Sequence, residues 1–199
     1  MHPTTHDESV RTFIAHVKKH TSEYGVSLTI TKFKQINMGY GFGRACGCFD
    51  GKIIRIAGKQ HDVVESILHE YSHFIQYIHS EDIWIKAMRN DLDKALYNPN
   101  VTDKQIGRML ELDKQLELDA EKKAVALIKK WNLPIDVEKY IKGANAYIYF
   151  YVYMMKYRRW HKKSPGIMPS ILDIMPSRFC KNYDKLPEEY EKLVNRYCI

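Results

Sequence analysis

Apolar residues recur at two different periods along this chain, and the change of period separates its elements. Helical spacing on one face predicts an amphipathic helix over 7–23. Apolar alternation then predicts a strand over 27–36. Two further apolar runs, 44–49 and 52–58, flank an Asp-Gly pair at 50–51, which predicts a hairpin with a tight turn. The glycines at 39, 41, 43 and 47 are typical of turns.

Beyond the hairpin the apolar spacing becomes helical. It predicts a helix over 61–79, with Asp62 as its cap or first-turn acid. The proline-containing stretch 164–187 is expected to be irregular. Further helices are predicted over 82–97, 103–131, 136–161 and 188–197. The predicted fold class is therefore α+β, with a small N-terminal sheet, one motif-bearing helix and a helical C-terminal body.

A chain of 199 residues has the size of one compact domain. We expect a single domain over 1–199. The sheet and the motif-bearing helix would occupy about 25–80, and the helical body about 82–199.

The helix predicted over 61–79 contains His69-Glu70-Tyr71-Ser72-His73, an H-E-x-x-H match. Residues four apart lie on one face of a helix, so both imidazoles can reach one ion. Catalytic zinc uses three protein ligands and keeps one open position. It lowers the pKa of a bound water towards ~7, and the carboxylate of Glu70 can take the proton. Two histidines and a glutamate on an apolar helix are costly to bury without a partner. The pattern therefore predicts a zinc metallopeptidase.

Glu117 is the first possibility for the third zinc ligand. It lies on the helix predicted over 103–131, whose apolar face can pack beside the motif helix. Glu121, one turn later, could accept a hydrogen bond from a ligand imidazole. The alternative is that Glu111, Glu117 and Glu121 form surface pairs with nearby lysines.

His79 is the second possibility, because its distance from His73 matches metzincin spacing. That class has a glycine where this chain has Gln76, and the glycine lets the chain leave the helix. If the helix continues, His79 lies on a different side from His73. Met168 and Met175, each followed by proline, are the possible counterparts of the methionine turn in that class.

At these residues the sequence resembles the gluzincins, and within them the minimal ImmA/IrrE-type zincin domains. The resemblance rests on the H-E-x-x-H motif and on Glu117-Leu118-Asp119-Ala120-Glu121 with Ala124 following. It implies a short sheet and a motif helix, His69, His73 and Glu117 as zinc ligands, and Glu70 as general base. The chain departs from the family pattern in three ways. The gap before Glu117 is long, Glu121 replaces Asp or Asn, and Lys123 stands where an aromatic residue is common.

Charge and cysteine content bear on partners and compartment. The formal net charge is +7, with a dense cluster at 156–163. The alternative function is thus a non-catalytic, metal-stabilised binding or regulatory protein that contacts nucleic acid or an acidic partner.

The N-terminus lacks a signal-peptide core, and the longest apolar stretch, 144–155, is too short to span a bilayer. We therefore expect a cytoplasmic protein without membrane contact, whose four cysteines are reduced. The sequence does not indicate an oligomeric state.

Three remaining features bear on the substrate side. The strand Lys52–Ala57 either pairs with an extended peptide substrate or is an ordinary core strand. The tyrosines over 147–157 either include an oxyanion-stabilising phenol or, as is more common, pack in the core. Cys46 and Cys48 lack a second ligand pair of suitable spacing, so they make a poor structural zinc site.

Overall fold

The computed structural model describes residues 5–37, 44–59, 62–79, 81–88, 92–98 and 100–199. The structure combines helices with a small sheet, which confirms the α+β class. The chain forms two compact units, Met1–Ile85 with Lys122–Ile135 and Lys86–Glu121 with Asp136–Ile199. The single-domain organisation over 1–199 stays a prediction. Among the described helices, none has both the length and the hydropathy needed to cross a bilayer.

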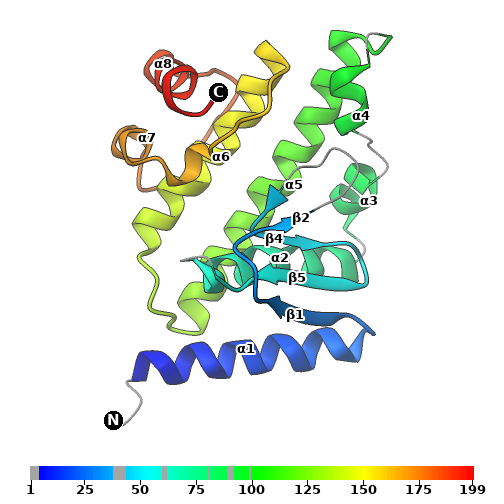
Figure 1. Ribbon diagram of the computed structural model, residues 1–199, viewed down its shortest axis with the longest axis vertical. Coiled ribbons are helices and arrows are strands. Elements are labelled where there is room, and N and C mark those ends of the chain that lie inside the picture. The colour runs from blue at the N-terminus through cyan, green and yellow to red at the C-terminus, as the bar shows by residue number, and fades with distance from the viewer. Residues whose placement is uncertain (1–4, 38–43, 60–61, 80, 89–91, 99) are drawn as a thin grey trace. The chain divides into compact units, whose positions relative to one another are not determined.

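The sheet of the first unit has three strands in the order β1-β5-β4 (Figure 1). They are β1 (Ser27–Thr31), β5 (Ile53–Ala57) and β4 (Gly47–Phe49). β5 pairs in parallel with β1 and antiparallel with β4, so the predicted hairpin is confirmed. Its turn places Gly51 at φ +85°, a conformation that glycine adopts without steric cost.

The strand predicted over 27–36 is interrupted. It ends at Thr31, and Ile36–Asn37 forms a separate short strand, β2, paired with β3 (Arg44–Ala45). Phe33 in the gap is 69% exposed, so it gains nothing from strand burial. Of the predicted turn glycines, those at 39, 41 and 43 lie outside the described residues.

Two helices cover the sheet of the first unit. The motif helix α2 (Val63–Ile78) packs on β4 and β5, and α1 (Thr5–Glu23) packs on β1 and α2 (Figure 1). Tyr71, inside the motif, points away from the motif histidines and fixes α2 to α1. Its buried hydroxyl lies 2.6 Å from Nδ1 of His20 and 3.2 Å from Nε2 of His16, and burial raises the pKa of Tyr71 to about 12. Asp62 precedes α2 but makes no side-chain capping bond.

The second unit is helical around an aromatic core. Its elements include α4 (Leu92–Tyr97), α6 (Val137–Tyr157), the 3-10 turn η1 (Pro165–Ile167), α7 (Pro169–Ile174) and α8 (Glu188–Tyr197). The core contains the inward tyrosines of α6, namely Tyr149, Tyr151 and Tyr153. Of the two alternatives for the tyrosines over 147–157, packing in the core is therefore confirmed for these three residues.

Two predicted helices have different boundaries in the structure. Of the helix expected over 82–97, the structure describes α3 (Asp82–Met88) and α4 (Leu92–Tyr97), and residues 89–91 lie outside the described part of the chain. The helix expected over 136–161 ends at Tyr157, because Arg158 adopts a left-handed conformation and its N–H donates to the carbonyl of Met154.

The stretch 164–187 is more regular than expected. Pro165 and Pro169 stand at the first positions of η1 and α7, where a missing N–H costs nothing and the fixed φ favours a helix. The prediction for 188–197 is confirmed by α8. The long helix predicted over 103–131 is α5 (Asp103–Lys130), which belongs partly to each unit.

Candidate metal centre

His69 and His73 lie one turn apart on α2, and their rings face each other. The ring centroids are 4.7 Å apart, and the two Nε2 atoms are 3.2 Å apart. Two nitrogens that bind one zinc ion at 2.0–2.1 Å in tetrahedral geometry lie roughly 3.3 Å apart. The imidazole pair therefore has the spacing that one shared cation requires.

Gln76 fixes the orientation of His73. It is fully buried, and its Oε1 lies 2.8 Å from Nδ1 of His73. The amide oxygen can only accept, so Nδ1–H of His73 donates and Nε2 keeps its lone pair for a metal. In the sequence Gln76 figured only as a departure from metzincin spacing. Its position three residues after His73, on the same helix face, is the signal that could have indicated this role.

Glu70 lies against the edge of the sheet. Its side chain is largely buried, and a Cβ added at Gly47 of β4 would lie 2.9 Å from both Cγ and Oε1 of Glu70. Glycine at this position makes room for the side chain of Glu70. Among the predicted turn glycines, Gly47 proves to be a strand residue with this separate task, which a turn pattern alone does not reveal.

Glu117 on α5 joins the histidine pair. One ligand atom from each of His69, His73 and Glu117 can be chosen so that all three lie within 4.8 Å of one another. Oε2 of Glu117 is buried. The pKa of the neighbouring Tyr151 is raised well above its usual value, first by burial and then by the charge of Glu117. Two imidazoles and a carboxylate are a ligand set that divalent zinc accepts, so this group could hold a metal ion.

The other glutamates of α5 have different surroundings. Glu111 forms an ion pair with Lys114 at 2.7 Å. For this residue the structure agrees with the alternative expectation, pairing with a nearby lysine. Glu121 is buried, and its Oε2 accepts a hydrogen bond of 2.6 Å from the hydroxyl of Tyr140. Its expected bond to a ligand imidazole stays a prediction.

His79 does not belong to the metal-binding group. α2 continues to Ile78, and His79 follows it as an exposed C-cap. This agrees with the prediction that, in an unbroken helix, His79 lies on a different side from His73. Met168 caps α7, and Met175 is buried in the core of the second unit. Both methionines therefore have structural roles.

Both β4 and β5 pack against the motif helix. Of the two alternatives for Lys52–Ala57, the structure supports the ordinary core strand, because β5 is central among the described strands of its sheet and has a partner on each side. Among the described strands, β4 lies at one edge of this sheet, and it carries Gly47. Trp84 contacts this region, with its ring 5.8 Å from that of His73.

The four cysteines form no disulfide bond in the described chain. Burial is the main cause that raises the pKa of both Cys46 and Cys48, which disfavours the thiolate form that binds metals.

Comparison with known proteins identifies no relative: no family model, no curated protein and no solved structure matches the chain.

Proposed function

We propose that this chain is a zinc-dependent metallopeptidase of the gluzincin type. The observation that carries the proposal is the convergence of His69, His73 and Glu117 within 4.8 Å, with Glu70 adjacent on α2. This combination supplies three ligands and a separate base, as hydrolytic zinc sites require.

Each residue has a distinct task in this proposal. His69, His73 and Glu117 would hold the metal, which when bound acts as a Lewis acid on a carbonyl and acidifies water. Glu70 takes the proton from the attacking water and passes it to the leaving amine. The side chain of Glu70 is buried against Gly47, and this contact limits the positions open to the carboxylate, which favours the proton transfer.

The position of β4 supports an extended peptide as substrate. In the described part of the chain β4 lies at an edge of its sheet, and an edge strand can pair its backbone with an added strand. Because Gly47 touches Glu70, a peptide aligned along β4 would pass close to the base.

The test is the variant Glu70→Gln, which keeps the shape of the side chain and removes the base. We expect hydrolysis of a fluorogenic peptide pool to fall about 10²–10⁴-fold, with zinc content unchanged. Glu8→Gln, at an exposed position of α1, is the matched control and should keep full activity. Hydrolysis that survives Glu70→Gln would contradict the mechanism. Wild-type protein that holds zinc but cleaves no peptide would instead favour the non-catalytic, metal-stabilised binding protein.

A further inference from the structure

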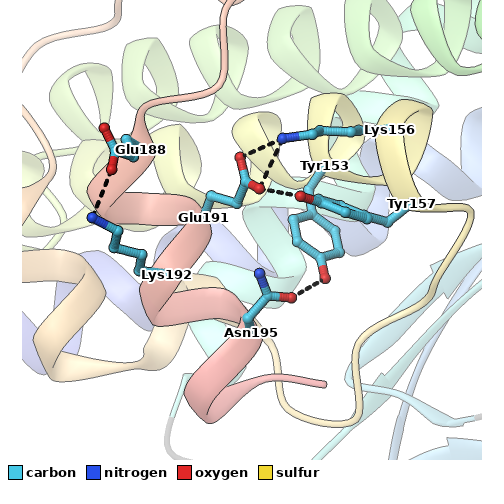
Figure 2. A network of polar contacts seen from close by, with 7 residues as sticks. All are labelled: Tyr153, Lys156, Tyr157, Glu188, Glu191, Lys192 and Asn195. Atoms are coloured by element: carbon cyan, nitrogen blue, oxygen red, sulfur yellow. Dashed lines mark hydrogen bonds and ion pairs between the residues drawn. The ribbon is translucent and has the colours of Figure 1, made fainter.

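The basic cluster at 156–163 contains two kinds of cation. Lys156 and Arg158 are engaged within the fold: Lys156 pairs with Glu191 at 2.8 Å, and Arg158 pairs with Asp103. Figure 2 shows Glu191 also accepting from the hydroxyl of Tyr157, so that α8 is tied to the end of α6. These contacts hold the segment that follows α6 in a defined place.

The remaining cations of the cluster project outwards beside the end of α8. Arg159, Lys162 and Lys163 are exposed. The backbone N–H groups of both lysines donate to the carbonyl of Cys198, at 2.7 and 3.3 Å. Because Cys198 directly follows α8, its neighbours Arg196 and Tyr197, also exposed, belong to the same area.

Two aromatic rings are exposed in this area. Trp160 is 41% exposed and stacks on His161, with the ring centroids 5.0 Å apart and the planes at 29°. His161 in turn contacts Phe150 in the core at 4.8 Å, and burial lowers the pKa of His161 to about 4. His161 is therefore an uncharged support for the indole. Tyr197 is 36% exposed and lies under the guanidinium of Arg196 at 5.1 Å.

We term these six residues the basic aromatic surface: Arg159, Trp160, Lys162, Lys163, Arg196 and Tyr197. The acidic residues on the adjoining elements include Glu191 and Glu188. Both are already paired, Glu191 with Lys156 and Glu188 with Lys192 (Figure 2). The four exposed cations of this surface therefore outnumber the one other acidic residue of α8, the exposed Glu189.

We propose that the basic aromatic surface binds single-stranded nucleic acid. Cations interleaved with exposed aromatic rings match a chain of phosphates carrying unpaired bases, because the bases can stack on the rings while the cations contact the backbone. In a duplex the bases are already stacked and paired, so the rings would gain little. The proposal is independent of the metal site.

The test is fluorescence anisotropy with a labelled oligothymidine of about 20 nucleotides, measured over a range of salt concentrations. If four cations contact phosphates, log K should fall with log salt at a slope of about −2.8, from about −0.7 per contact in a single strand. Replacing Arg159, Lys162 and Lys163 together by alanine should reduce the slope to about −0.7. Alanine at Lys18, Lys19 and Lys34, which are exposed in the first unit, removes the same charge and should leave the slope unchanged.

The stacking contact has its own variant. Trp160→Ala should weaken binding about tenfold without changing the salt slope, whereas Trp160→Phe should retain most of the affinity. The variants should keep the wild-type circular dichroism spectrum and zinc content. The proposal is overturned if the triple alanine variant binds as the wild type does, or if a duplex of equal length binds as tightly. It is also overturned if the surface binds phosphatidylserine vesicles but no oligonucleotide.

Discussion

At the scale of single residues, Gly47 and Glu70 are coupled by steric contact. A methyl group at position 47 would lie 2.9 Å from two atoms of Glu70, so the carboxylate would have to move. We expect Gly47→Ala to lower kcat about ten- to a hundredfold, while zinc remains bound because neither histidine moves. Steady-state kinetics with elemental analysis checks this. Unchanged turnover would show that the position of Glu70 against β4 does not matter for catalysis.

His161 gives a pH dependence of stability. Its pKa is about 4 in the folded protein against an ordinary value of 6.5, so between these values the unfolded chain binds a proton that the folded chain does not. The stability contributed by the neutral ring is thus complete above pH 6.5 and is lost as the pH falls towards 4. Between pH 7.5 and pH 5 the loss should be about 2 kcal/mol. Urea unfolding of the wild type and of His161→Phe at both pH values measures this loss of unfolding free energy. The variant has no titrating group at position 161, so its loss should be smaller by about that amount. Equal losses in the two proteins would contradict the account.

The residues of the motif could be predicted because their spacing along a helix is a local property. His69, Glu70 and His73 follow from sequence alone. Gln76 and Gly47 do not, because their roles depend on the path of a helix and on how a strand packs against it. Trp160 is similar, since its exposure depends on where α6 ends.

At the scale of elements, apolar periodicity located the long helices and the hairpin, and missed features that depend on single backbone conformations. Arg158 ends α6 in a left-handed conformation that a sequence pattern disfavours for a non-glycine residue. Pro165 and Pro169 begin helical turns, although proline-rich composition suggested irregular structure. The central place of β5 depends on its pairing with β1, which is distant in sequence.

Gly107 tests the contribution of local propensity to α5. A Cβ at this position would meet nothing within 4 Å, so alanine there adds helix propensity without a clash. We expect Gly107→Ala to raise the free energy of unfolding by about 0.5–1 kcal/mol, measured by urea denaturation. It also serves as the matched control for Gly47→Ala, because its activity should be unchanged. A lower free energy of unfolding would mean that this turn of α5 requires glycine.

At the scale of the whole molecule, the third ligand was the hardest part of the site to predict. Glu117 and His79 both remained open from the sequence, because the choice depends on which distant helix comes close to α2. The structure groups Glu117 with the histidines and leaves His79 as an exposed cap. Net charge alone also left the binding partner of the chain open. The value of +7 permits polyanion binding, whereas the division of the basic cluster into paired and exposed cations is visible only in the fold.

The most direct test of the metal centre is zinc content by elemental analysis of purified, folded protein. The wild type and His79→Ala should each hold about one zinc ion per chain, and Glu117→Ala should hold much less, since two imidazoles alone bind zinc weakly. A Glu117→Ala variant that retains full zinc, or a folded wild type that takes up none, would contradict the ligand set on which the proposed function depends.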